Sequence, residues 1–470
     1  MAAVDSCSDF RVDFITESVV KTVGLTPKPY ILTLSNLDLL SGRFPVTYLY
    51  FFRSPNQFHS SSPKIIDNLK ASLSQCLSRF YPFAGRIVPN PKTDEPEILC
   101  DNRGVLVVEA QANIRLKELE FYNLNKYVER GKLVPAFRQR GGDDFAVQIQ
   151  ITRYTCGGLC LTFTFDHALG DASSFAKFLT TWSELATNKP PSCSPDHRRF
   201  LLRPRFPPRY NTSLDETFVS CSLDDILNMR PPPTLLSSIM LKRLYYIDAS
   251  SIHKLQKLAS EEDDGIGTSR RRTKIEAFSA YIWKVMVNAV DKSHNKCKMG
   301  WLVDGRTRIP GIMSDYIGNV LSLTFGELSM DELKHGTISK IASHVHAAIS
   351  TATNAEHFLD LIDWIECHRP GLMLSKMVLG RDGPGAAIVV SSGRRFPVGE
   401  LEFGFGSPVL GTVCSTIERI GVGYVNQRPS ARGDGSWTVS AILWPDMVAA
   451  LESHSECIFQ PITAHDLHLS

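Results

Sequence analysis

A proline-rich stretch near the middle of the chain is the feature that most limits how it can fold. Six prolines lie among several arginines between residues 188 and 211: Pro190, Pro191, Pro195, Pro204, Pro207 and Pro208. Proline removes a backbone donor and fixes its own φ angle, so neither a long helix nor a central strand can run through this stretch. We therefore expect two folded halves joined by a crossing linker, which a length of 470 residues also favours.

Both halves mix helical and strand-like patterns. In the first half, apolar residues recur every three or four positions from Ile65 to Leu77, which predicts an amphipathic helix that ends before Pro82. Further strands are predicted at 145–151, 159–165, 299–304, 387–391 and 437–443, and further helices at 172–187, 250–260, 274–290, 338–351, 358–367 and 445–453. This mixture predicts an α/β (mixed α+β) protein with layered domains at 1–188 and 216–470 and a linker at 189–215.

Composition excludes several classes of protein. Lysine and arginine total 51 against 49 acidic residues, a net charge of +2, so no global basic field would draw the chain to nucleic acid. Apolar runs such as 46–52 are far too short to span a bilayer. The segment Met1–Arg11 lacks the pattern of a secretory signal. We therefore expect a cytoplasmic globular protein with no nucleic-acid partner and no membrane span.

The cysteines favour reduced thiols over a metal site. Eleven cysteines are scattered along the chain, and the closest pair, Cys156 and Cys160, has no second pair to complete a four-ligand zinc site. The histidines, such as His344 and His346, form no readable metal triad. We therefore expect no metal, and thiols kept reduced as in the cytosol.

The segment Leu161–Trp182, reading LTFTFDHALGDASSFAKFLTTW, carries the clearest chemical signal. Asp166 and His167 directly follow a predicted strand, and Gly170 separates them from the next helix. A histidine held on such a turn suits a general base, although one that merely fills a strand-to-helix corner fits the same pattern. Asp171 stands at the predicted helix N-cap, so we expect it to accept backbone amides and to point away from His167. A buried arginine would then keep Asp171 charged.

Five segments, in order along the chain, resemble motifs of the plant BAHD acyltransferases. They are SRFYPFAGR at 78–86, HALGD at 167–171 (the HxxxD motif), VDGRTR at 303–308, YIGN at 316–319 and EFGFG at 402–406 (the DFGWG motif). Because the matches follow in the family's order from residue 78 to residue 406, the chain is identified as a member of that family. Within the family, LSNLDLL at 34–40, TKIEAFSAYIWK at 273–284 and GWLVDGRTR at 300–308 resemble the coniferyl alcohol acyltransferases.

The resemblance implies a monomer with a chloramphenicol-acetyltransferase-like fold: two similar-sized domains, a solvent tunnel between them, and His167 reachable from both mouths. A segment near residues 385–405 would pack with the first domain. Acyl-CoA would be the co-substrate, and no cofactor would be permanently bound. The implied activity is acyl transfer from CoA to the hydroxyl of a phenylpropanoid alcohol such as coniferyl alcohol, with His167 as general base in a ternary complex. N-acylation of an amine and a non-catalytic partner protein stay open as alternatives.

The resemblance also implies roles for individual residues. Asp171 would form a structural salt bridge with Arg306 or Arg308. Ser391 would donate to the oxyanion of the tetrahedral intermediate, or else only cap a strand end. The residues expected to bind CoA are Thr273, Lys274 and Ser392. Further candidates are Arg394, Arg395 and the run Arg270, Arg271 and Arg272, although a solvated loop explains that run better. The residues expected to support the donor channel are Glu402, Phe403, Gly404, Phe405 and Gly406.

Three positions depart from the family pattern. Gly393 stands where the family usually has tryptophan, which we expect to open space in the acceptor pocket. Glu402 replaces aspartate and Phe405 replaces tryptophan, which we expect to reduce rigidity in that segment. Gly404 and Gly406 are kept, so the turn they form should survive.

Overall fold

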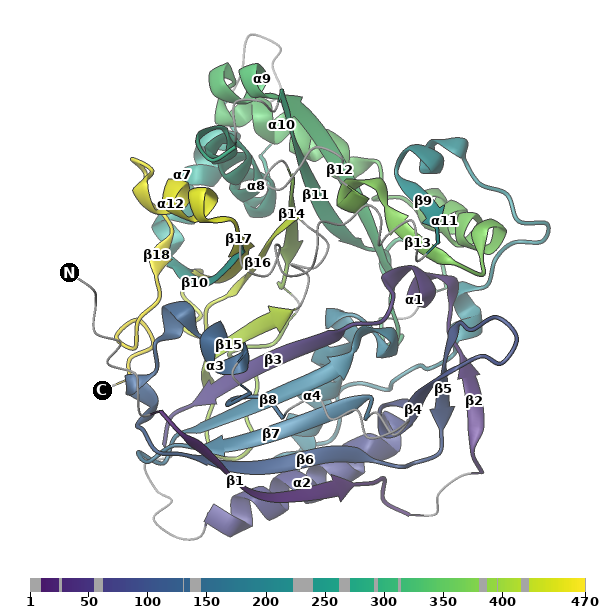
Figure 1. Cartoon of the computed structure of the whole chain (residues 1–470), viewed down its shortest axis with the longest axis vertical. Helices are drawn as coiled ribbons and strands as arrows, with labels where there is room; N and C mark the ends of the chain where they lie inside the picture. The colour runs from purple at the N-terminus through teal and green to yellow at the C-terminus, as the bar shows by residue number, and fades with distance from the viewer. Residues whose placement is uncertain are drawn as a thin grey trace.

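The computed structural model describes residues 10–24, 28–54, 62–129, 131–135, 145–222, 240–261, 271–290, 295–311, 314–379, 387–394, 396–415 and 422–469. Two large mixed sheets, each covered by helices, form its framework (Figure 1). The first sheet comes mainly from the first half of the chain and the second from the second half. This layered arrangement is the one that the mixed sequence patterns predict.

The first sheet has six strands in the order β1-β6-β7-β8-β3-β15. Their bounds are β1 Val12–Val20, β3 Pro45–Phe52, β6 Val105–Ala112, β7 Val147–Arg153, β8 Leu159–Asp166 and β15 Pro408–Ser415. Neighbouring strands are antiparallel except β6 and β7. The predicted strands at 145–151 and 159–165 correspond to β7 and β8.

The second sheet has seven strands in the order β12-β11-β14-β16-β17-β10-β18. Their bounds are β10 Leu241–Ile247, β11 Lys296–Asp304, β12 Leu321–Ser329, β14 Ala387–Ser392, β16 Gly423–Pro429, β17 Trp437–Leu443 and β18 Gln460–Pro461. Strand β14 runs parallel to both neighbours, β11 and β16. The carboxyl ends of these three strands therefore lie at one edge of the sheet, where loops carry functional side chains.

Two smaller sheets and a set of helices complete the fold. β2 Tyr30–Thr33, β4 Arg86–Pro89 and β5 Pro96–Cys100 form one small sheet, and β9 Phe218–Cys221 and β13 Leu372–Ser375 form the other. The helices are α1 Asn36–Ser41, α2 Ser62–Arg79, α3 Asn125–Glu129, α4 Ala172–Ala186, α7 Ala249–Ala259, α8 Lys274–Val285, α9 Met330–His335, α10 Ile338–Ser350, α11 Ala355–His368 and α12 Pro445–Ser453.

Helix α4 shows why the first domain packs as it does. Its apolar stripe includes Phe175, Phe178 and Trp182, which are almost fully buried against the first sheet and α2. The predicted periodicity thus places one face of the helix in the core. The indole N–H of Trp182 donates to the carbonyl of Leu69 (3.1 Å) and so ties α4 to α2.

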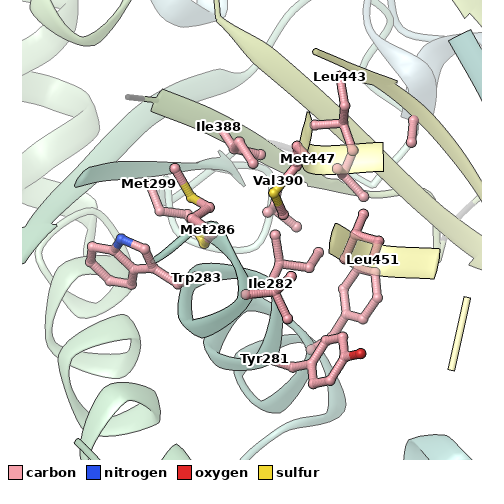
Figure 2. Close-up of a cluster of buried hydrophobic side chains, with 14 of the residues drawn as sticks. Tyr281, Ile282, Trp283, Met286, Met299, Ile388, Val390, Leu443, Met447 and Leu451 are labelled. Atoms are coloured by element: carbon pink, nitrogen blue, oxygen red, sulfur yellow. The ribbon is translucent and has the colours of Figure 1, made fainter. Parts of the chain in front are cut away.

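The second domain has its own core between its sheet and helices α8 and α12. Tyr281, Ile282, Trp283 and Met286 pack against residues of β11, β14 and β17 (Figure 2). Ile388 and Val390 of β14 point from the sheet toward α8 in this view. This orientation defines the helix-covered face of β14.

The division between domains is less simple than the expected boundary at residue 216. Strand β15 pairs with β3 in the first sheet although it follows β14 of the second (Figure 1). Phe396, Leu401, Phe403 and Phe405 lie in the core of the first domain. The exchanged stretch therefore spans about 396–415, whereas β14, inside the expected 385–405 segment, stays in the second sheet.

The linker is held by buried carboxylates of α11. Arg205 forms ion pairs with Asp360 (2.5 Å) and Asp363 (2.6 Å). The backbone amides of Arg209 and Asn211 donate to the same two carboxylates. These contacts replace the regular backbone pairing that prolines prevent.

Among the described residues, no helix is long and apolar enough to cross a membrane. Ten cysteines in this part of the chain are free thiols. The side chains described hold no group of three or more histidine, cysteine or acidic residues that could bind a metal ion.

Candidate active site

His167 begins a 3-10 turn, His167–Leu169, directly after β8. Its backbone amide donates to the carbonyl of Phe44 (3.0 Å), and its own carbonyl accepts from the side chain of Asn319 (2.9 Å). The imidazole stacks on the Phe44 ring with centroids 4.6 Å apart. Backbone and ring are therefore both fixed, as a group that must meet a substrate in one orientation requires.

The surroundings of the His167 ring favour its neutral form. Burial lowers its pKa below the ordinary value, although the carboxylates of Asp171, Asp166 and Asp38 act in the opposite direction. Its Nδ1 is buried and has no hydrogen-bond partner among the described residues, while the residue as a whole is partly exposed. Nε2 is thus the ring nitrogen left to exchange a proton.

Asp171 is the N-cap of α4 and points into a buried polar network. Its Oδ1 accepts from the amides of Ser173 and Ser174 (both 3.1 Å), and its Oδ2 accepts from the amide of Val320 (3.0 Å). The Arg306 guanidinium donates to the same Oδ2 at 2.7 Å. Burial raises the pKa of Asp171, but Arg306 and the amides outweigh it, so the net pKa is lowered and the group stays charged.

Of the two candidate partners of Asp171, only Arg306 contacts it; Arg308 is exposed. All three nitrogens of the Arg306 guanidinium donate hydrogen bonds. Besides Asp171, the acceptors are Asp304 Oδ1, Ser174 Oγ and the carbonyls of Tyr316 and Gly318. Arg306 thereby joins the turn after His167 to the second domain.

A second buried network holds the backbone of His167, and sequence reasoning missed its members. Asp38 lies in α1 and accepts from both the backbone amide (2.7 Å) and the side chain (2.9 Å) of Asn319. Arg199, from the linker, forms an ion pair with Asp38 at 3.2 Å and donates to the carbonyl of Leu169 (3.0 Å). Asp38 and Asn319 fall inside LSNLDLL and YIGN, so those segments could have pointed to them.

The YIGN turn passes too close to this network for any residue but glycine. Gly318 has φ +153°, and a Cβ there would lie 2.1 Å from an Arg199 nitrogen. A side chain would therefore displace the arginine that supports the His167 turn.

Ser391 and Ser392 point to opposite faces of the second sheet, because side chains alternate along a strand. Ser392 shares the helix-covered face with Val390, and its hydroxyl accepts from Gln427 (2.8 Å). Ser391, half-buried, lies on the opposite face beside Asn426 of β16. That is the face turned toward the first domain, since Arg428, two residues beyond Asn426, lies over Tyr48 of β3.

The space that we expected beside Gly393 is filled. A Cβ at Gly393 would lie 2.5 Å from Cγ and 3.0 Å from Nε of Arg428. The Arg428 guanidinium extends over the rings of Tyr48 and Phe396, 5.2 and 5.0 Å from their centroids. The absence of a side chain at Gly393 thus makes room for the Arg428 side chain, and the position that a Cβ would occupy is already taken.

The residues expected to bind CoA lie on the helix-covered side. Thr273 caps α8 and bonds to Glu276 through its hydroxyl (2.8 Å), and Lys274 is the first residue of the helix and partly exposed. Among the alternatives, Arg272 donates to Ser343 (2.7 Å), while Arg271 and Arg394 are exposed. Arg270 and Arg395 lie outside the described residues.

The segment 402–406 packs on the first domain. Phe403 meets Trp182 edge-on at 5.0 Å, and Phe405 meets Phe52 at 4.9 Å. Glu402 is exposed and only loosely paired with Lys189 (3.7 Å), while its backbone is held by the Ser183 hydroxyl. The last residues expected to support the channel, Gly404 and Gly406, have φ of +87° and +99°, as a tight glycine turn requires.

Solved structures with the same architecture identify the fold of this chain. Vinorine synthase matches with a TM-score of 0.72 at 20% identity, over 97% of this chain and 100% of that one. F. graminearum TRI101 complexed with coenzyme A and deoxynivalenol matches with a TM-score of 0.71 at 17% identity, over 92% and 99%. The predicted two-domain, chloramphenicol-acetyltransferase-like fold is confirmed.

Sequence comparison gives the family. The model described as "Transferase family" matches residues 10–458, so the chain belongs to this family, the BAHD acyltransferases, and is an acyltransferase. Anthranilate N-benzoyltransferase protein 1 of Dianthus caryophyllus is 28% identical over 90% of this chain and 94% of its own length. Shikimate O-hydroxycinnamoyltransferase of Nicotiana tabacum is 27% identical over 94% and 98%. Enzymes of this family use acyl-CoA as co-substrate.

Proposed function

We propose that this protein transfers an acyl group from acyl-CoA to the hydroxyl of a phenylpropanoid alcohol such as coniferyl alcohol, with His167 as general base. The observation that carries the proposal is the fixed imidazole of His167, a residue that is partly exposed as a whole and whose pKa is lowered by burial. A neutral imidazole can accept a proton at neutral pH, whereas an imidazolium cannot.

The proposed reaction is direct transfer between two bound substrates. The alcohol oxygen attacks the thioester carbon while Nε2 of His167 accepts the hydroxyl proton. A tetrahedral intermediate forms, and its oxyanion accepts a hydrogen bond from Ser391, which faces the first domain. The intermediate then expels the CoA thiolate, which takes the proton back from the imidazolium. No covalent acyl-enzyme is formed.

In this proposal Asp171 has a structural role and does not take part in proton transfer. Its carboxylate is saturated by Arg306 and three backbone amides, so none of its acceptors is left for the His167 ring. It holds the turn and the start of α4 in place. Lys274, Thr273 and Ser392 would contact CoA from the helix-covered side of the second sheet, and the tunnel that connects both sides stays a prediction.

The test is release of free thiol from acetyl-, malonyl- or hydroxycinnamoyl-CoA in the presence of an alcohol panel. We expect release only when an acceptor is present, and His167→Ala should lower kcat by about 10²–10⁴-fold. His344→Ala, which removes an exposed histidine on α10, is the matched control and should retain wild-type rates. Normal transfer by a folded His167→Ala protein would exclude the general-base role.

N-acylation is the second candidate, because a relative 28% identical is named an anthranilate N-benzoyltransferase. The same base would serve an amine nucleophile. Including anthranilate beside coniferyl alcohol in the acceptor panel separates the two activities. If no donor releases thiol with either acceptor, a non-catalytic partner protein becomes the better interpretation.

A further inference from the structure

The face of the second sheet that meets the first domain carries buried polar groups without partners. Arg428 is 3% exposed, and its Nε and Nη1 are buried with no hydrogen-bond partner in the part of the chain that the structure describes. Asn426, two residues earlier on the same face, is 7% exposed, and its Oδ1 likewise has no partner there. Buried polar groups are normally hydrogen-bonded to the chain, to ordered water or to a ligand, so this cluster is a candidate ligand site.

Arg428 in particular is a buried cation that nothing in the described chain neutralises. No described carboxylate lies within 4.0 Å of its guanidinium. The rings of Tyr48 and Phe396 stabilise the charge through cation–π contacts. An aromatic ring, however, is not an oxygen acceptor, so the N–H groups at Nε and Nη1 still lack conventional hydrogen bonds. A planar fork of N–H donors in a dry setting is suited to a carboxylate.

Ring contacts connect the cluster to β8, the strand that leads to His167. The Tyr48 ring under Arg428 also stacks on Phe165, 5.6 Å between centroids, and Phe165 is two residues before His167. Ser391, opposite Asn426 in the register, belongs to the same face. Gly393 is the residue that lets the Arg428 side chain lie there. The phosphates of CoA are separated from the thioester by the whole pantetheine arm. If Ser391 is at the reaction centre, a group on this face would therefore meet the acyl group or the acceptor and not the phosphates.

We propose that Arg428 binds a carboxylate carried by one of the two substrates, either on the acyl group of the donor or on the acceptor. The proposal rests on the acyl-transfer function above. It makes Arg428 a specificity-determining residue: a substrate with a correctly placed carboxylate supplies the missing acceptor atoms, while a neutral substrate leaves the N–H donors unpaired. Asn426 would orient the guanidinium or a neighbouring polar group of the same substrate.

The experiment compares matched substrates in two arms. The donor arm measures kcat/KM for malonyl-CoA and acetyl-CoA with coniferyl alcohol, and the acceptor arm measures shikimate and coniferyl alcohol with p-coumaroyl-CoA. We expect the wild type to prefer the carboxylated member in one arm, and Arg428→Met to lower that ratio by about 30-fold or more, since a buried charge loses its partner. The arm that responds identifies the source of the carboxylate.

The matched control is Arg432→Met, which removes an exposed arginine that also lies over a tyrosine, Tyr246, but is hydrogen-bonded to the Asp466 carbonyl. It should leave both ratios unchanged. If Arg428→Met also leaves both ratios unchanged, or if the wild type prefers neither carboxylated substrate, the proposal is wrong. Should Arg428→Met fail to fold, Arg428→Lys keeps the charge without the planar fork, and an unchanged ratio in that variant overturns the proposal.

A binding measurement keeps this proposal separate from the catalytic one. Malonyl-CoA or shikimate should raise the Tm of the wild type, and also of His167→Ala, more than that of Arg428→Met. Such a difference without any thiol release would support the carboxylate site while excluding the proposed transfer. Equal Tm shifts in wild type and Arg428→Met would exclude the site even if transfer occurs.

Discussion

Arg306 and Arg428 are both buried where the domains meet, and they differ in what surrounds their charge. Arg306 is 4% exposed and Arg428 is 3% exposed. All three nitrogens of the Arg306 guanidinium donate, and Asp171 neutralises it at 2.7 Å. Arg428 has two aromatic rings and, among the residues described, no anion. The two side chains are therefore equally buried, but the charge of Arg306 is neutralised by a carboxylate and the charge of Arg428 is not neutralised by any carboxylate of the described chain.

The difference separates a structural role from a binding role. Arg306 satisfies the acceptors that converge on it from α4, the YIGN turn and the end of β11, so the chain itself completes the network. Desolvating a charge is costly unless it is paired, and at Arg428 the described chain offsets that cost only through two cation–π contacts. A ligand that brings an anion would compensate it.

The largest effect is expected from breaking the completed network. Arg306→Met leaves Asp171 buried without its counter-ion, and removing one partner of a buried ion pair costs about 3–5 kcal/mol. Urea unfolding followed by circular dichroism would measure this loss in the free energy of unfolding. Arg308→Met, which changes an exposed arginine of the same motif, should stay within about 0.5 kcal/mol. A loss below about 1 kcal/mol in Arg306→Met would mean that the network is not essential for stability.

The charge of Asp171 should also be visible in the pH dependence of transfer. The pKa of His167 is lowered by burial, so kcat/KM should fall on the acid side only below about pH 6.5, where the base becomes protonated. Asp171 acts to raise that pKa. Asp171→Asn removes the anion but keeps a good N-cap residue, so the acid limb should move to still lower pH. A shift to higher pH would contradict this electrostatic assignment.

Much of the fold could be predicted where local patterns decide the structure. The strand predicted at 437–443 coincides with β17, and the helix predicted at 172–187 differs from α4 by one residue. Strand β16 was missed because its sequence, GYVNQRP, places polar side chains at buried positions and so lacks an apolar pattern. The pairing of β15 with β3 joins segments more than 350 residues apart, which no local pattern can indicate.

In the candidate site, too, some residues could be predicted from local sequence and others could not. His167 and Asp171 lie on a strand-turn-helix segment that the local sequence predicts. Arg306 was predicted from the resemblance of its segment to a family motif. The roles of Asp38, Arg199 and Asn319 depend on contacts between segments far apart in the sequence, which local patterns do not indicate. The burial of Arg428 arises only when two sheets meet over Gly393, so nothing in the surrounding residues distinguishes it from an ordinary exposed arginine.

The smallest expected effect concerns the ligand-free Arg428→Met variant. Its free energy of unfolding should not fall, in contrast to that of Arg306→Met. Arg428→Met keeps much of the side-chain volume but removes an unpaired buried charge, and the relief of desolvation exceeds the lost cation–π contacts, worth about 1–2 kcal/mol. We expect the free energy of unfolding to stay the same or to rise by up to about 2 kcal/mol, as measured by urea unfolding. A fall of more than about 2 kcal/mol would show that Arg428, like Arg306, is held by the chain itself, and the contrast between the two arginines would disappear.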